Sequence, residues 1–148
     1  MEKTFLIFIN QTRNINLNQY QSQFEEILEK ILKPLKLANN LEISVTFVTK
    51  SAIKKINLEH LGKNITTDVL SFKSEIPLRS SKVLADIFIC PPKAKINAQK
   101  AAISEKREIL QLFIHALMHI SDLDHEKPQM KEKWDLIFKK LTNIIEEK

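Results

Sequence analysis

Apolar and polar residues follow two different periods along this chain. Residues 3–9 contain the short apolar run FLIFI, and in the stretch LEISVTFVT, residues 41–49, most apolar side chains occupy every second position. Alternation of this kind predicts a strand with one buried face. Apolar runs at 68–72 and 83–90 predict two further strands, and the segment KSEIPLRSS between them predicts a loop.

Elsewhere the apolar residues recur every three or four positions, the spacing that predicts amphipathic helices. Asn18 is the expected N-cap of the first helix, and Gly62 is the expected stop of the second. Pro91 and Pro92 suit the entrance of the third helix, and Ser104 is expected to cap the fourth. The predicted helices span about residues 18–35, 51–61, 92–102, 104–120 and 128–145.

The predicted order of elements is βαβαββααα, and the chain has no internal repeat, low-complexity tract or linker. This order favours an α+β fold in which a small mixed β-sheet is packed with helices. Its 148 residues are enough to bury a core without a disulfide or a structural metal. We therefore expect a single domain over residues 1–148.

Cysteine content and net charge limit the cellular location and the partners that we expect for this protein. Cys90 is the only cysteine, so the chain cannot form an internal disulfide, and we expect a cytoplasmic location. The run FLIFI is too short for a signal peptide or a membrane span, so we expect no membrane association. The formal net charge of +5 favours polyanionic partners but does not identify one.

The stretch HALMHISDLDHE, residues 115–126, holds three of the four histidines. His115 and His119 are four residues apart in a helical stretch, so both imidazoles project from one face. His125 follows after SDLD, a polar segment that favours a turn back toward the helix. Three imidazoles with an open fourth position suit a catalytic Zn²⁺ site on the C-terminal part of a helix and the following turn.

Two alternatives to this zinc site remain. In the first, His115 is a packing residue of the helix and the other histidines lie at the surface. In the second, the three imidazoles bind nickel, copper or iron instead of zinc. The histidine spacing also occurs in metalloproteases of the HExxHxxGxxH type. Those enzymes need a glutamate general base directly after the first histidine, and this chain has Ala116 there, with Asp122 at the glycine position. Peptide hydrolysis by that mechanism is therefore not expected.

Three motifs resemble the YbeY family of bacterial endoribonucleases, the rRNA maturation factors. They are HALMHISDLDHE, TTDVLSF at 66–72 and LADIFIC at 84–90, which occur in the family's order and at comparable separations. The resemblance spans most of the chain. It implies that His115, His119 and His125 are the zinc ligands, since these positions match the family's histidine motif.

The resemblance also implies an activity and partners. It implies a Zn(2+)-dependent endoribonuclease specific for single-stranded RNA, acting in 16S rRNA 3′-end maturation and ribosome quality control. The expected partners are rRNA and the small ribosomal subunit or its assembly factors. Zinc lowers the pKa of a bound water and polarises phosphoryl oxygens, which is consistent with phosphodiester hydrolysis.

One departure from the family pattern concerns the phosphate-binding cation. The family has an arginine before the TDVLSF motif, and this chain has Leu61 at that position. His60, Lys63 and Arg79 are candidate replacements, although lysine binds phosphate only as a point charge.

Four further polar residues each have a functional and a structural interpretation. In the functional interpretation, Asp124 orients a zinc histidine or accepts a proton from water. In the structural one, it stabilises the turn. Asp68 lines the cleft or bonds the backbone at the start of its strand, and Ser71 binds substrate phosphate or faces the sheet surface. An acidic residue in an apolar strand is costly unless it is paired or exposed, so Asp86 is a candidate partner of the zinc ligands. Trp134 is expected in the core.

Basic residues are frequent on both sides of the histidine helix, and they form either a path for RNA or ordinary solvated helix faces. These residues are Lys93, Lys95, Lys100, Lys106, Arg107, Lys127, Lys131 and Lys133. The alternative to a nuclease is a ribosome-assembly or RNA-binding factor whose zinc is mainly structural. Another metal-dependent hydrolase is a third hypothesis, because the ligands alone do not choose a reaction.

Overall fold

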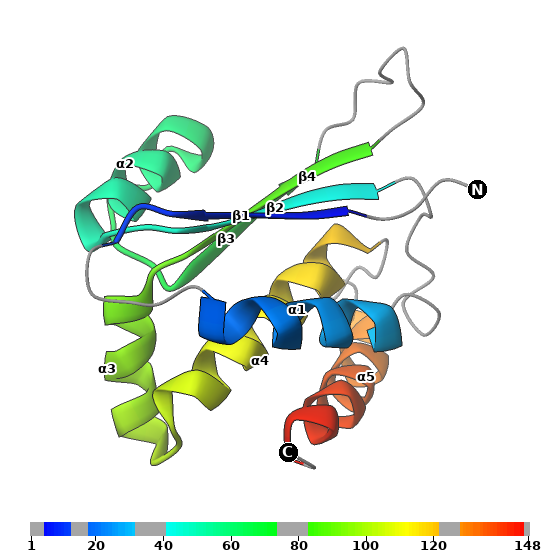
Figure 1. The fold of residues 1–148 in the computed structure, drawn as a ribbon. Helices are drawn as coiled ribbons and strands as arrows, with labels where there is room; N and C mark the ends of the chain where they lie inside the picture. The colour runs from blue at the N-terminus through cyan, green and yellow to red at the C-terminus, as the bar shows by residue number, and fades with distance from the viewer. Residues whose placement is uncertain (1–4, 13–17, 32–40, 74–82, 122–127, 147–148) are drawn as a thin grey trace.

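The computed structural model describes residues 5–12, 18–31, 41–73, 83–121 and 128–146 (Figure 1). Within these ranges, nine elements follow the predicted order βαβαββααα, which confirms the α+β class. They are β1 (Phe5–Asn10), α1 (Asn18–Ile31), β2 (Leu41–Phe47), α2 (Lys50–Leu61), β3 (Val69–Lys73), β4 (Val83–Ile89), α3 (Pro91–Ala101), α4 (Glu105–Ile120) and α5 (Pro128–Glu146). No helix among these is long and apolar enough to cross a bilayer.

The four strands form one mixed sheet in the order β1-β2-β4-β3. β1 pairs with β2 and β2 with β4 in parallel, while β3 runs antiparallel to β4 at the edge. β3 is therefore an edge strand among the described strands, and it contacts α4 on one face of the sheet and α2 on the other.

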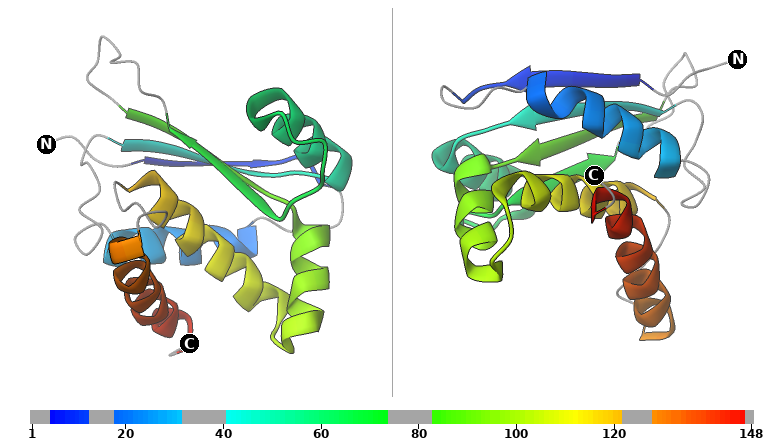
Figure 2. Two further views of the ribbon diagram at one scale, coloured as in Figure 1. Left: turned by 180° about the vertical axis from the view of Figure 1, so that it is seen from behind. Right: turned by 60° about the horizontal axis from the view of Figure 1, so that its bottom comes forward.

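One face of the sheet carries α1, α3, α4 and α5, and α2 lies on the other face near one end (Figures 1 and 2). Strand alternation explains the division. Ile43, Val45 and Phe47 of β2 are fully buried, as are Ile87 and Ile89 of β4, and all five side chains belong to the main core. The expected alternating face of residues 41–47 is thus confirmed for its described side chains.

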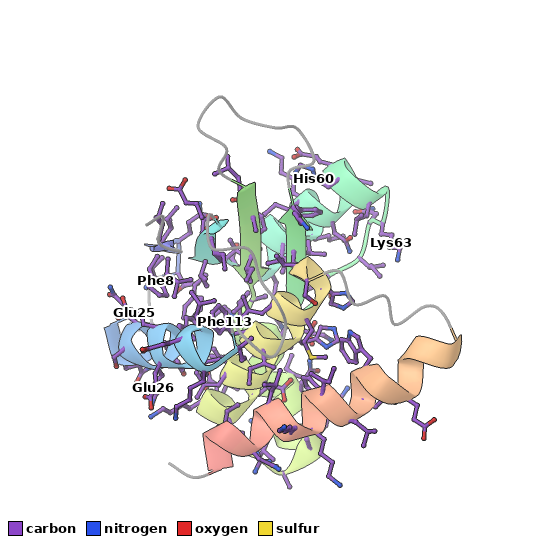
Figure 3. The ribbon with its side chains drawn as sticks, turned by 90° about the vertical axis from the view of Figure 1, so that its right-hand side faces the viewer. Phe8, Glu25, Glu26, His60, Lys63 and Phe113 are labelled. Atoms are coloured by element: carbon purple, nitrogen blue, oxygen red, sulfur yellow. The ribbon has the colours of Figure 1, made fainter. Side chains whose placement is uncertain are left out.

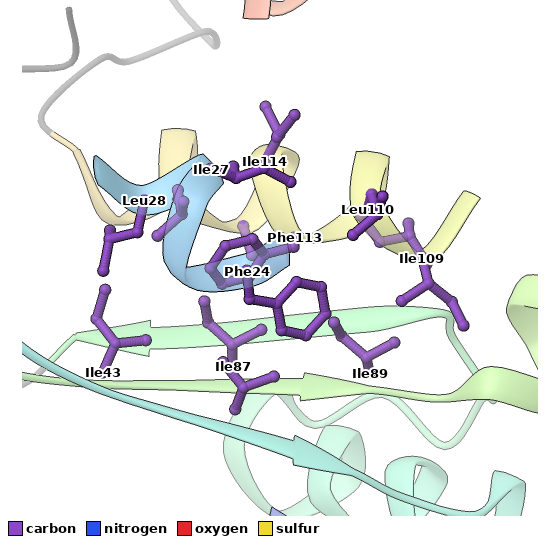
Figure 4. Packing of buried hydrophobic residues seen from close by; sticks show 14 of the residues in the cluster. Phe24, Ile27, Leu28, Ile43, Ile87, Ile89, Ile109, Leu110, Phe113 and Ile114 are labelled. Carbon is purple, nitrogen blue, oxygen red and sulfur yellow. The ribbon is translucent and has the colours of Figure 1, made fainter. Parts of the chain in front are cut away.

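The main core joins α1 and α4 to the sheet (Figure 4). The rings of Phe24 and Phe113 stack with centroids 4.3 Å apart, and Phe47 contacts Phe24 edge-on. Nine residues of α4 are buried, so both the rotation and the position of this helix relative to the sheet are fixed by packing. A smaller cluster joins α2 to the sheet and contains Val48, Ile53 of α2, Leu70 and Cys90.

The helix ends show how local sequence sets the element boundaries. Thr49 caps α2 by accepting a hydrogen bond from the Ala52 N–H at 3.2 Å, so this helix begins one residue before the expected Ser51. Gly62 ends it in the left-handed region with φ 69°, as expected. Ser104 caps α4 by accepting from the Arg107 N–H at 3.0 Å, which confirms that prediction.

Candidate metal centre and adjoining groove

Two histidines of α4 meet at the helix surface. The Nε2 atoms of His115 and His119 are 2.8 Å apart, and their ring centroids are 4.5 Å apart. His119 is exposed and His115 is half-buried, so the pair is accessible from solvent. The spacing of four residues has therefore brought the two ring nitrogens together, as the sequence predicted.

The nitrogen pair fits a metal ion. Imidazole nitrogens lie about 2.0–2.1 Å from zinc, which places two nitrogens of a tetrahedral site ~3.3 Å apart. The observed 2.8 Å corresponds to a hydrogen bond in which one ring donates its N–H to the other. A cation replacing that proton requires the rings to separate by only about half an ångström.

The third expected ligand, His125, lies outside the described residues, as do Asp122, Asp124, Lys127 and Arg79. Among the residues that the structure describes, no group of three histidine, cysteine, aspartate or glutamate side chains is placed to hold a metal. The three-ligand site therefore stays a prediction, of which two ligands have a geometry that fits.

Aromatic residues of α5 pack against the histidine pair. The indole of Trp134 meets the His115 ring edge-on with centroids 5.1 Å apart and lies 5.7 Å from the His119 ring. Phe138 meets His115 at 5.9 Å and stacks on Trp134 at 5.6 Å. Trp134 is buried, which confirms its expected place in the core. It also limits the rotation of both imidazoles.

A groove of about 330 Å³ opens beside the histidine pair. It lies between β3 and the C-terminal half of α4, and its lining residues are Leu61, Val69, Leu70, Ser71, Lys73, His115, Ala116, His119 and Ile120. Sheet register explains the presence of Ser71, because this residue pairs with Ile87, whose side chain faces the core and α4. Ser71 and the histidines thus line one groove, and the binding of substrate phosphate by Ser71 stays a prediction.

Lys73 is a groove residue that the sequence interpretation missed. It lies two residues beyond Ser71 on β3 and pairs with the buried Ala85, so it shares the face of the sheet that meets α4. The alternation of the strand carried this signal, but the predicted strand ended at Phe72. Leu61 is 51% exposed and lines the same groove, so the position of the missing arginine lies within it.

A second, smaller pocket of about 200 Å³ lies on the other side of His115. Its lining residues are Asp68, Val69, Glu108, Gln111, Leu112, His115 and Phe138. Because His115 borders both spaces, the pocket and the groove lie next to one another along β3 and α4.

Asp68, the residue before the first residue of β3, is held in place by several hydrogen bonds. The Asn97 side chain donates to Oδ2 at 3.0 Å, and the Thr67 hydroxyl donates to Oδ1 at 3.4 Å. The backbone carbonyl of Asp68 also accepts from the Cys90 N–H at 2.8 Å. Asp68 thus lines the small pocket and not the groove beside both histidines, and its functional role stays a prediction.

Glu108 is a second acidic residue of the small pocket, and the sequence interpretation did not single it out. Burial raises the pKa of its carboxyl, and the nearby negative charge of Asp68 raises it further. The protonated form of Glu108 is therefore stabilised relative to an exposed glutamate.

The other predicted cations lie apart from the histidine pair. His60 and Lys63 are exposed at the end of α2 and just after it (Figure 3), and neither lines the groove or the small pocket. The His60 ring packs on Phe72 at 4.7 Å, on the opposite face of the sheet from α4. Lys95, Lys100 and Lys106 are exposed, as expected under both interpretations of the basic helix faces.

Asp86 does not support the metal ligands, contrary to the hypothesis drawn from its apolar strand. Its neighbours Ala85 and Ile87 point into the core, so Asp86 projects from the opposite, exposed face of β4. There its Oδ1 accepts a hydrogen bond from the Ser44 hydroxyl at 2.6 Å. Exposure and this bond remove the burial cost that had suggested a functional role.

Comparisons with known proteins agree on one family. The sequence model of the family described as Endoribonuclease YbeY matches residues 6–147. Endoribonuclease YbeY of a Sulfurihydrogenibium species is 38% identical over 80% of this chain and 81% of its own length. That of Spiroplasma citri is 31% identical over 99% of this chain and 96% of its own.

A solved structure supports the fold independently. The solution structure of TM1509 from Thermotoga maritima matches with a TM-score of 0.61, covering 96% of this chain and 92% of that chain. The two sequences are 22% identical, so this likeness shows the shared fold alone.

Proposed function

Because the chain belongs to the YbeY endoribonuclease family, we propose that it is a zinc-dependent endoribonuclease acting on single-stranded RNA. Its expected substrate is 16S rRNA, at the 3′-end maturation step and in ribosome quality control in the cytoplasm, with the small ribosomal subunit or its assembly factors as partners. The observation that carries the proposal is the convergence of two imidazole nitrogens, 2.8 Å apart, at a solvent-accessible groove.

His115 and His119 would hold the zinc ion, together with His125 of the same motif. When bound, zinc polarises a phosphoryl oxygen and makes a coordinated water more acidic. Trp134 packs against both imidazoles from α5 and Phe138 packs against that of His115, and this packing would limit the rotation of the two ligand rings.

Ser71 and Lys73 would bind the phosphate backbone of the RNA. Both line the groove beside the histidines, Ser71 with a hydroxyl donor and Lys73 with a positive charge. Lys73 would thereby provide, in the same groove, the positive charge that the family's arginine provides at the position of Leu61. The net charge of +5 adds a general attraction for RNA.

Leu61 is also the observation that favours a second function. An exposed leucine in the groove provides no contact to phosphate, as expected if the protein binds RNA during ribosome assembly with a mainly structural zinc and cuts weakly or not at all. Lys73 argues for the nuclease, because it places a cation in the same groove.

Metal content and RNA cleavage separate the two functions. We expect the purified protein to bind one zinc ion and to cut a defined single-stranded RNA but not its duplex form. His115→Ala and His119→Ala should each lose zinc and cleavage, whereas His60→Ala, which changes the fourth histidine, packed on Phe72 and not part of the groove lining, should retain zinc. Cleavage by a metal-free double variant would refute the catalytic zinc. Zinc binding and ribosomal-particle binding without cleavage would favour the assembly factor.

A further inference from the structure

The small pocket beside His115 differs chemically from the groove. The groove carries Lys73, whereas the described residues that line the pocket include no lysine or arginine and provide the carboxyl groups of Asp68 and Glu108. A phosphate group would be repelled there. The pocket therefore suits a part of the RNA that carries hydrogen-bond donors rather than negative charge.

The acceptor of the pocket has a fixed orientation. Each oxygen of the Asp68 carboxylate already accepts one hydrogen bond, from Asn97 or Thr67, and each oxygen retains a lone pair for a second. Beside it, the amide of Gln111 offers both a donor and an acceptor. A rigid pair of acceptors with a neighbouring amide recognises an edge that presents two adjacent N–H donors beside a C=O acceptor.

The remaining walls are apolar. Val69, Leu112 and Phe138 line the pocket, and Phe138 offers an aromatic ring. Proteins bind unpaired bases by stacking them on aromatic side chains and bonding their Watson–Crick edges. The volume of about 200 Å³ is below the ~300–1,000 Å³ of pockets for drug-sized ligands, so it suits one base.

We propose that this pocket binds one unpaired base of the RNA substrate and prefers guanine. Guanine presents adjacent N1–H and N2–H donors, which both carboxylate oxygens of Asp68 can accept, and an O6 acceptor for the amide of Gln111. Adenine, uracil and cytosine do not present this pair of donors beside an acceptor. The inference rests on the proposed function, since it names the base that the RNA substrate carries next to the metal centre.

The position of the pocket relates this base to the bond that is cut. Glu108 and His115 are seven residues apart on α4, about 10 Å along the helix. An RNA strand that lies along β3 and α4 can therefore place one base in the pocket and a phosphate of the same or the next nucleotide at the histidine pair. The pocket then selects the nucleotide at the cleavage position.

Binding measurements test the base preference without relying on cleavage. The probes are four fluorescent eight-nucleotide RNAs, uridine throughout except for G, A, C or U at one central position, with their integrity checked on a gel. The wild-type protein should bind the G probe at least ~5-fold tighter than the others, the low end expected of one bidentate contact. Asp68→Asn replaces an acceptor by a donor and should abolish the preference.

A matched control separates base recognition from charge. Asp86→Asn removes the same charge from the exposed opposite face, so it should change the affinity for all four probes equally and keep the preference for G. Gln111→Glu, which turns the donor facing O6 into an acceptor, is a second pocket variant that leaves the Asp68 bonds intact. It should also lose the preference.

Each outcome distinguishes this proposal from the nuclease proposal. Equal affinity of the wild type for all four probes, or a preference for G that persists in both pocket variants, overturns the base pocket. Stabilisation by Mg²⁺ that depends on Asp68, together with equal probe affinities, would assign a cation site instead and overturn it as well. A preference for G in a protein that never cuts RNA supports the pocket and refutes the nuclease.

Discussion

Replacing Trp134 by alanine should destabilise the fold and also weaken the proposed binding of zinc. The side chain is only 7% exposed, and a tryptophan of this kind removes about 150–250 Å² from water. At about 25 cal/mol per Å² this burial contributes ~4–6 kcal/mol, and measured aromatic-to-alanine changes in cores cost about 3–5 kcal/mol. The free energy of unfolding of native proteins is about 5–15 kcal/mol, so the variant should lose a large part of its stability.

The effect on the metal follows from the ring contacts. Without the indole, the rings of His115 and His119 lose a neighbour whose centroid lies 5.1 and 5.7 Å from theirs, and they gain rotational freedom. Zinc affinity should therefore fall about 10–100-fold, as it does when other residues that hold metal ligands in place are mutated. Trp134→Phe keeps an aromatic ring and should lose much less stability and much less zinc affinity.

Urea unfolding followed by circular dichroism gives the free energy, and titration against a chelator gives the zinc affinity. Leu136→Ala is the matched control on the same helix, because Leu136 is 65% exposed and its truncation should cost less than about 0.5 kcal/mol. Zinc affinity of Trp134→Ala equal to that of the wild type, under conditions in which the variant is folded, would refute the argument that α5 orients the imidazoles.

Three further changes probe the groove, the pocket and the second core. Lys73→Met should weaken RNA binding for every sequence and reduce its dependence on salt by about one phosphate contact, whereas Lys63→Met should change neither by as much. The raised pKa of Glu108 means that the folded state holds its proton more tightly, so stability is lost as pH rises from about 4.5 through the raised value; Glu108→Gln should lack this loss in urea unfolding across pH. Burial raises the pKa of the Cys90 thiol, so alkylation should be slow in the native protein and fast in urea; fast native alkylation would contradict its burial.

The histidine pair and the element order could be predicted because each depends on local periodicity. A spacing of four residues on a helix brings His115 and His119 together whatever the rest of the fold does. Gly62 and Ser104 likewise act within a few residues of their own position. These features required no knowledge of how the strands pair.

The groove and the pocket could not be predicted in the same way, because they depend on register. Lys73 faces α4 only because β3 pairs with β4 so that Lys73 lies opposite Ala85. Glu108 belongs to the pocket only because α4 packs beside the start of β3. Asp86 shows the opposite error: alternation with Ala85 and Ile87 already indicated that it points away from the core, but its acidity within an apolar run was given more weight.

The packing of α4 has a consequence for how this site can change over evolutionary time. The histidines lie on a helix that nine buried residues lock in place, so almost any substitution that moves them also damages the core. The groove residues Leu61 and Lys73 lie instead at the exposed end of α2 and the exposed end of β3, where side chains can be exchanged at little cost in stability. Single mutations can therefore change the charge of the groove, while the helix that carries the histidine pair stays unchanged.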